Sequence, residues 1–151
     1  MTEPSPFAEP MDRPLWMGVL ARAKEPRLAQ LFPVLPDHSI LRAPEVGAVM
    51  VRGRIGGVGQ PFNLGELTIT RCTLALTAGV VGHAYVQGRD KVHAMRAAAV
   101  DALMQTDDAD QVRTTVLVPL AAEETARRIT RATKAAATKV EFFTLVRGAD
   151  Q

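Results

Sequence analysis

The clearest hydrophobic pattern in the chain runs over residues 80–105 and changes its period part-way. Residues 80–87 are rich in β-forming side chains, and Gly88 interrupts them. Beyond Asp90, apolar and small residues recur every three or four positions, as on one helical face; they are Val92, Met95, Ala99, Ala102 and Leu103. The stretch predicts a strand, a loop and a helix with a buried apolar face, capped by Asp90 through the N–H of His93. Its many alanines leave little bulk, so the helix axis can lie close to a sheet or partner.

Polar side chains crowd the joint between this expected strand and helix; they are Gln87, Arg89, Asp90, Lys91 and His93. The backbone N–H groups of the first helical turn point the same way, so the joint has the chemistry of an anion site. The alternative is that Asp90 merely caps the helix while Arg89 and Lys91 are solvated or hold another loop. The spacing of the residues is compatible with both interpretations.

The middle of the chain alternates apolar and polar residues, as a half-buried strand does. The alternation is clearest over 48–55, where Arg52 and Arg54 leave from one face. We expect further strands over 39–43, 64–76 and 80–87, with a turn at Pro44, Glu45 and Gly47 between the first two. Short connections favour antiparallel neighbours, because parallel pairing needs a long crossover.

Proline positions mark the starts of two helices near the N-terminus. Pro14 follows Asp12, which suits a cap, and Pro26 opens a second short helix. Trp16 is the only tryptophan, and a lone tryptophan on a short helix usually anchors a core or an interface. Together with the strands, these helices predict an α+β fold, an antiparallel sheet of about four to six strands packed with helices.

Three segments are expected in the last third of the chain. Residues 115–118 form a strand or a packed connection, which periodicity does not decide, and Pro119 ends them. Residues 121–139 predict a helix with acidic residues early and basic ones late, which suits the helix dipole, and with a largely solvated basic face. Residues 140–147 read as a strand with apolar bulk on both sides, which predicts burial within this chain or against a partner.

Bulk properties limit the class of protein. The chain has 151 residues, 47% of them hydrophobic and 23% charged, and a formal net charge of +2, which suits one globular domain. We assign that domain to 13–148, preceded by a disordered or loosely packed lead at 1–12 and followed by a tail at 149–151. The single cysteine excludes an internal disulfide, and neither a signal peptide nor a membrane-spanning run is recognisable, so we expect a cytoplasmic protein.

The side chains that suggest chemistry are mainly cations. Arg52 and Arg54 share one strand face, Arg71 lies on another strand, and Gln87, Arg89, Lys91 and His93 sit at the strand-to-helix joint. If they converge, they suit a polyanion such as a triphosphate or phosphonate, because arginine binds phosphate in a bidentate way. The alternative is that several of them pair with Glu66, Asp90 or carboxylates of a partner subunit.

Other kinds of site are weakly supported. The glycine-rich run GGVGQPFNLGE lacks the ending of a nucleotide-binding loop and joins two strands, so we interpret it as a mobile or bulged hairpin connection. His38, His83, His93 and Cys72 lack the spacing of a zinc site, so we assign no metal and no cofactor. Cys72 lies inside an expected strand, which favours a small buried residue over a nucleophile. Mild net charge and 5% aromatic residues argue against nucleic acid.

Several separated motifs carry a family resemblance. They are LWMGVLARA near the N-terminus, RGRIGGVG at 52–59, PFNLGELTITRC at 61–72, VQGRDKVHA followed by VDALMQ within 86–105, and VEFFTLVRG at 140–148. In this order they resemble the PhnG family, a small subunit of the bacterial carbon–phosphorus lyase system for phosphonate use. The resemblance covers nearly the whole chain from Arg13 onward.

The resemblance implies a subunit that acts with PhnH, PhnI and PhnL and assembles with PhnH, PhnI and PhnJ. In the implied reaction an alkylphosphonate displaces adenine from ATP, giving a ribose 1-alkylphosphonate 5-triphosphate, with PhnI as the catalytic subunit. No catalytic residue carries over to this chain. We therefore expect a supporting subunit without contact to membrane or nucleic acid, whose interface candidates are Trp16, Phe142, Phe143, Leu145 and Arg147. Self-association of the isolated chain stays open, and the alternative is a stand-alone phosphonate- or nucleotide-binding protein or phosphate-handling enzyme that uses the arginines directly.

Overall fold

The structure is a computed structural model that describes residues 12–140. Its helices are α1 (Arg13–Arg22), α2 (Glu25–Leu31), α3 (Lys91–Leu103), α4 (Ala109–Val112) and α5 (Val118–Ala137). Its strands are β1 (His38–Arg54), β2 (Pro61–Leu76) and β3 (Val81–Gln87). They form one antiparallel sheet in the order β1-β2-β3, which confirms the expected α+β class and the antiparallel pairing.

The sheet has three strands in the described part of the chain, fewer than the four to six expected. The segments 39–43 and 48–55 are not separate strands, because β1 runs through both. The half-burial expected over 48–55 is wrong, because these residues are exposed or only partly buried, with Val49 41% and Ile55 66% exposed. The register against β2 shifts between Arg42 and Glu45, so Pro44 lies at a bulge, while Glu45 and Gly47 pair with Arg71 and Ile69 and form no turn. Pro44 is tolerated there because β1 is an edge strand, where a missing N–H need not break the ladder. The strand expected over 140–147 falls almost entirely outside the described residues.

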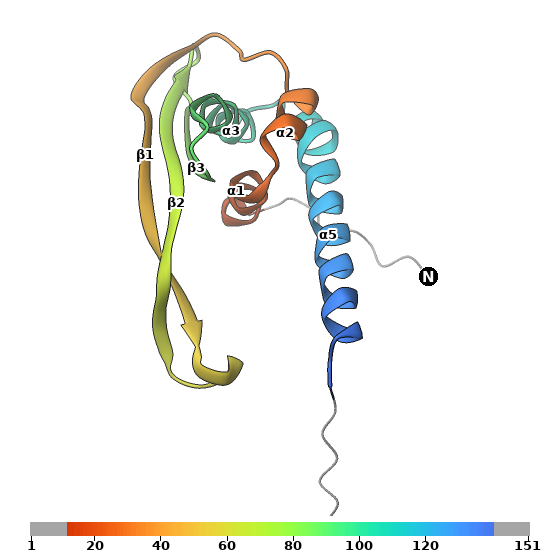
Figure 1. Cartoon of the computed structure of the whole chain (residues 1–151). Coiled ribbons are helices and arrows are strands. Elements are labelled where there is room, and N and C mark those ends of the chain that lie inside the picture. The colour runs from red at the N-terminus through yellow and green to blue at the C-terminus, as the bar shows by residue number, and fades with distance from the viewer. Residues whose placement is uncertain (1–11, 141–151) are drawn as a thin grey trace, which may run out of the picture.

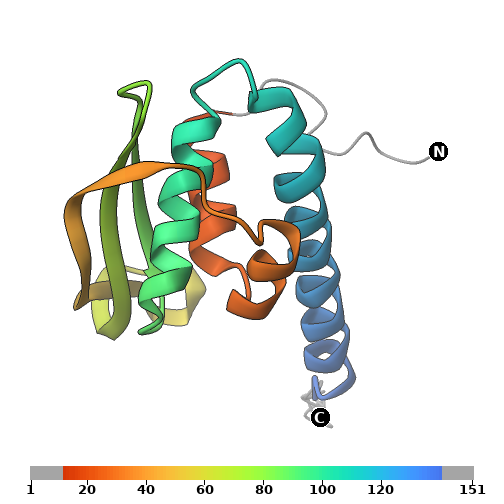
Figure 2. The ribbon, with the colours of Figure 1, turned by 90° about the horizontal axis from the view of Figure 1, so that it is seen from above.

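Helix α3 lies at the centre of the molecule, between the sheet and the N-terminal helices (Figures 1 and 2). The expected cap is confirmed: the Asp90 carboxylate accepts a hydrogen bond from the N–H of His93 at 2.7 Å. The buried surface of α3 is wider than the single face expected. Its buried residues do not follow one stripe; they are His93, Ala94 and Ala97–Ala102. Val92, which was expected on the buried face, is 44% exposed. A helix covered by a sheet on one side and by helices on the other is buried nearly all round.

The approach between α3 and β3 is very close, as the alanine content predicts. A Cβ atom added to Gly82 of β3 would overlap the carbonyl oxygen of Ala98 and lie 2.8 Å from the backbone nitrogen of Ala102. Only a glycine opposite alanines permits this distance between strand and helix. The core therefore depends on small side chains as much as on large ones such as Leu28, Leu74 and Leu117, which are fully buried.

A buried carboxylate ties α1 to α3 and to β3. Asp101, fully buried on α3, accepts hydrogen bonds from the guanidinium of Arg13 at 2.6 and 3.1 Å and from the backbone N–H of His83 at 2.8 Å. It also accepts one from the indole Nε1 of Trp16 at 2.8 Å. Trp16 was one of the interface candidates, but it is 8% exposed and belongs to the core of the chain itself. Trp16 was expected to anchor either a core or an interface, and in the structure it anchors the core.

The region before α5 is helical, so neither a strand nor an irregular connection forms over 115–118. A π-helical segment, Arg113–Leu117, leads into α5, and Pro119 lies in the first turn of that helix instead of ending the segment. Proline fits a first helical turn because the N–H it lacks would have no partner there. Helix α5 packs through Leu120 and Ala121, while its later turns run clear of the other elements (Figure 1).

Candidate functional site

The arginines of β1 lie far along the β1–β2 hairpin. Arg52 stands opposite Asn63 and Arg54 opposite Pro61, whereas β3 ends with Gln87 opposite Ile69. The Arg54 guanidinium donates to the carbonyl oxygen of Gly59 at 3.1 Å, across the hairpin tip. The register therefore does not bring these two arginines together with the strand-to-helix joint at 87–93.

Arg71 is engaged on the sheet surface. It stands between Glu45 of β1 and Tyr85 of β3, and its Nε and Nη2 donate to one oxygen of Glu45 at 3.2 and 2.9 Å. Arg42 lies 3.8 Å from the same oxygen. Arg71 thus pairs with Glu45 of the same chain, a residue that was expected to lie in a turn.

The strand-to-helix joint keeps Gln87, Arg89 and Lys91 exposed. Within residues 12–140, Arg89 and Lys91 make no ion pair. The helix start itself is occupied, because Asp90 already accepts the N–H of His93. What remains at the joint is exposed positive charge beside a capped helix, which agrees with the alternative that Asp90 caps the helix while Arg89 and Lys91 are solvated.

His93 points into the protein and not toward the other cations. Its side chain is 2% exposed, and neither ring nitrogen has a hydrogen-bond partner among the described residues. Burial lowers the pKa of His93, and the charges of Asp90 and Glu25 and the nearby backbone of Leu20 only partly oppose this effect. The imidazole is thus held neutral beneath the joint, where it does not meet an anion from solution.

Cys72 and the histidines do not form a reactive group in the described region. Cys72 is 1% exposed, its Sγ lies 3.6 Å from the carbonyl oxygen of Arg42, and burial raises the pKa of its thiol. Across residues 12–140, no three histidine, cysteine, aspartate or glutamate side chains gather as metal ligands would. Only the first part of the glycine-rich run, residues 56–60, lies at the hairpin tip, whereas 61–66 belong to β2. At the tip Gly56 and Gly57 adopt positive φ angles and the N–H of Gly59 donates to the carbonyl oxygen of Ile55.

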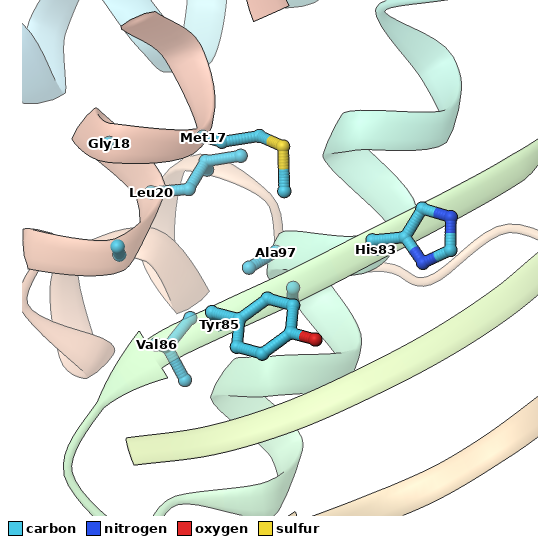
Figure 3. A pocket seen from close by; sticks show the side chains of 9 residues that line it. Met17, Gly18, Leu20, His83, Tyr85, Val86 and Ala97 are labelled. Carbon is cyan, nitrogen blue, oxygen red and sulfur yellow. The ribbon is translucent and has the colours of Figure 1, made fainter. Parts of the chain in front are cut away.

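A small apolar hollow lies between α1 and β3 (Figure 3). It measures roughly 210 Å³ and is lined by Met17, Leu20, Val86 and Ala97, with His83 and Tyr85 on the strand beside it. His83 Nδ1 is 3.1 Å from the Thr73 hydroxyl, and Tyr85 is half exposed. No arginine or lysine lines this hollow, so it suits an apolar side chain better than a phosphate.

A second hollow, of roughly 300 Å³, is strongly basic; we call it the basic hollow. It lies where α1, the start of α2, the end of β3 and α5 meet, and its lining is Arg22, Lys24, Gln87, Glu124, Arg127, Arg128 and Arg131. Five cations thus surround one carboxylate. Of the residues proposed from the sequence as anion contacts, only Gln87 lines it.

The charges of the basic hollow are only partly neutralised. Glu124 accepts from Arg22 at 2.6 Å and from Arg128 at 3.1 Å. Burial acts to raise the pKa of Glu124, but the hydrogen bond from Arg22 and the nearby arginines outweigh it and lower that pKa. Lys24, Arg127 and Arg131 have no ion pair within the described residues, so the hollow offers three cations to an anion. Sequence analysis missed it because no spacing links residues from four separate elements.

Comparison with known proteins gives the chain its family. A family model described as "Phosphonate metabolism protein PhnG" matches residues 11–148. The chain belongs to the PhnG family. The resemblance deduced from the separated motifs is thereby confirmed.

One curated relative has the same family name. The protein from Rhizobium meliloti (strain 1021) named alpha-D-ribose 1-methylphosphonate 5-triphosphate synthase subunit PhnG is 44% identical over 141 residues, covering 89% of this chain and 88% of the relative. In this PhnG-family chain, no described helix is long and apolar enough to cross a membrane. Phe142, Phe143, Leu145 and Arg147, the remaining interface candidates, lie outside the described residues.

Proposed function

We propose that this chain is a subunit of a ribose 1-methylphosphonate 5-triphosphate synthase, which transfers the ribose triphosphate moiety of ATP to an alkylphosphonate and releases adenine. The observation that carries the proposal is the 44% identity to a synthase subunit over nearly the full length of both chains. Its partners are PhnI, PhnH, PhnJ and PhnL-type subunits, and it works in the cytoplasm, where its buried, unpaired Cys72 stays reduced.

Within the complex, we propose that the chain supports the reaction without catalysing it. The side chains best suited to catalysis have structural roles that keep them from a substrate. Cys72 and His93 are buried, and Asp101 is hydrogen-bonded to Arg13 and Trp16 of α1. Exposed apolar side chains on the β1–β2 hairpin give the chain a surface for assembly. We keep Phe142, Phe143, Leu145 and Arg147 as proposed contacts because of their two-sided apolar pattern.

Reconstitution tests this function directly. A matched set of PhnI, PhnH and PhnL is incubated with ATP and methylphosphonate, with and without this protein, and adenine and the triphosphate product are followed. Product that forms only when the chain is present supports the subunit role. Equal product without it would show that the synthase does not need this chain.

A second candidate function, direct binding of a polyanion, is favoured by the basic hollow. Lys24, Arg127 and Arg131 are in position to bind a triphosphate or phosphonate without displacing the Glu124 pairs. Calorimetric titration of the full chain with tripolyphosphate should show binding that weakens with salt. Arg127→Ala with Arg131→Ala should raise Kd by about tenfold or more, since charge-assisted contacts are lost. Arg52→Ala should leave Kd unchanged, and equal effects of both variants would exclude the hollow as the site.

A further inference from the structure

The outer half of the β1–β2 hairpin, residues 46–68, extends beyond the rest of the molecule; we call it the arm. β3 pairs with β2 only from Ile69 to Ala75, while β1 and β2 remain paired to each other out to Arg54 and Pro61. The arm is therefore a two-stranded ribbon that runs past β3 and α3 (Figure 1). A two-stranded ribbon without a covering layer is marginally stable in water.

Apolar side chains of the arm are exposed on both strands and at the tip. Val49 and Met50 of β1 are 41% and 53% exposed, and Phe62 and Leu64 of β2 are 41% and 66% exposed. Ile55 and Val58 continue this surface around the tip. The Phe62 ring lies over Gly53, since a Cβ there would be 3.4 Å from it, and Phe62 is nevertheless 41% exposed. Several exposed apolar side chains gathered on one hairpin mark an interaction site.

Both long edges of the arm also have unpaired backbone groups. β1 is an edge strand, and residues 61–67 of β2 have no strand on the side where β3 has ended. Unpaired strand edges readily accept an extended segment of another protein, because each added residue pairs N–H and C=O groups. The edge of β2 next to Phe62 and Leu64 combines these backbone groups with apolar side chains.

We propose that the arm docks onto another subunit of the synthase, whose extended segment adds to the free edge of β2 at 61–67 and covers Phe62 and Leu64 with apolar side chains. The inference rests on the proposed function, because it takes the partner from the same complex. The partner presents carboxylates opposite Arg52, whose side chain has no ion pair within the described chain. In size, nine residues of β1 give a ribbon roughly 30 Å long, which is enough to pair with an extended segment along the edge of β2.

Charge favours another subunit over a second copy of this chain. The arm contains two cations, Arg52 and Arg54, and a single carboxylate, Glu66, which stands opposite Met50. An arm from a second copy would bring the same excess of positive charge, which disfavours pairing of the two. A surface with an excess of carboxylates is the complementary one.

The test measures binding of the full chain to the purified partner subunits. Phe62→Ser with Leu64→Ser should raise Kd by about 30-fold or more, because two central anchors are lost. Arg52→Glu should weaken binding by about tenfold and Arg52→Lys should restore it. Val34→Ser, at an apolar residue that is 76% exposed outside the arm, is the matched control and should change Kd by less than about twofold. Hydrogen exchange should show new protection of the 61–67 amides in the complex.

The outcomes separate this inference from the proposed function. If the chain does not bind the partner subunits and adds nothing to product formation, the proposed function fails. If it binds them and the Phe62 and Leu64 double variant binds as tightly as the unchanged chain, the arm is not the docking surface although the subunit role stands. If the isolated chain is a dimer that the double variant makes monomeric, with partner binding unaffected, the occupant is a second copy and the proposal is overturned.

Discussion

The indole Nε1 of Trp16 donates a hydrogen bond to the carboxylate of Asp101 at 2.8 Å, across 85 residues of sequence. The same carboxylate accepts from Arg13 and from the backbone N–H of His83, so one fully buried side chain holds together α1, α3 and β3. The Asp101 hydrogen bond raises the pKa of Arg13, although partial burial opposes it. A carboxylate with three separate donors is satisfied in the interior, whereas the donors would be left unpaired without it.

Replacement of this carboxylate should therefore be costly. Asp101→Ala should lower the free energy of unfolding by about 2–4 kcal/mol, because it leaves three donors without their acceptor. Urea unfolding followed by the fluorescence of Trp16 measures the change. Asp110→Ala is the control, since the Asp110 side chain is 85% exposed and its ion pair with Arg113 should contribute less than about 0.5 kcal/mol. Similar losses in both variants would contradict the structural role given to Asp101.

The contact of Gly82 with α3 predicts a second loss of stability. Gly82→Ala places a Cβ atom against the backbone of Ala98 and Ala102, and the strand or helix must shift to admit it. We expect a loss of about 2–3 kcal/mol, in the range of other overpacked cores. Gly47→Ala, where an added Cβ meets nothing within 4 Å, should change stability by less than about 0.5 kcal/mol. Thermal unfolding of the two variants measures both changes, and equal losses of stability would contradict the close contact of Gly82 with α3.

Much of this arrangement could be predicted from the sequence. The cap at Asp90, the alanine-rich α3 and the strands expected over 64–76 and 80–87 follow from short-range patterns, and the structure confirms them. The continuity of β1 could not be predicted, because Pro44 reads as a turn until an edge position is known. The separation of Arg52 and Arg54 from the joint at 87–93 depends on where β3 ends along β2, and strand register is a property of the whole sheet.

His93 gives the protein a predictable dependence on pH. Its pKa lies below the ordinary value of 6.5 because burial disfavours the charged ring. As the pH falls below 6.5, the unfolded chain binds the proton before the folded chain does, so the free energy of unfolding should decrease. Denaturant unfolding between pH 7.5 and 5.5 should show this slope, while the corresponding loss from Glu124 begins only below its ordinary value of 4.5.

Two variants identify the group responsible for that slope. His93→Leu should remove most of it, because leucine has no group that titrates in this window. His83→Gln changes an exposed histidine on β3 and should keep the slope. A slope that persists in His93→Leu would mean that another group titrates in this window.

The thiol of Cys72 should be inert in the folded chain. It is 1% exposed and burial raises its pKa, so little thiolate is available and a reagent reaches it only when the structure opens. A disulfide reagent such as dithiobis(nitrobenzoate) should react on the order of a hundred times more slowly with the folded than with the unfolded chain. Val34→Cys adds an exposed thiol and should give one fast equivalent beside the slow one. Rapid reaction of the unchanged chain would contradict the burial of Cys72.

The arm has a consequence for how the protein is made. A ribbon with unpaired strand edges and exposed apolar side chains promotes aggregation unless another surface covers it. A copy of the chain without its partner exposes these edges to other proteins in the cell. We therefore expect synthesis in step with the partners, and expect surplus copies to aggregate or be degraded. The exposed hairpin should thus limit how much of the protein a cell can hold without its partners, whatever the reaction of the complex.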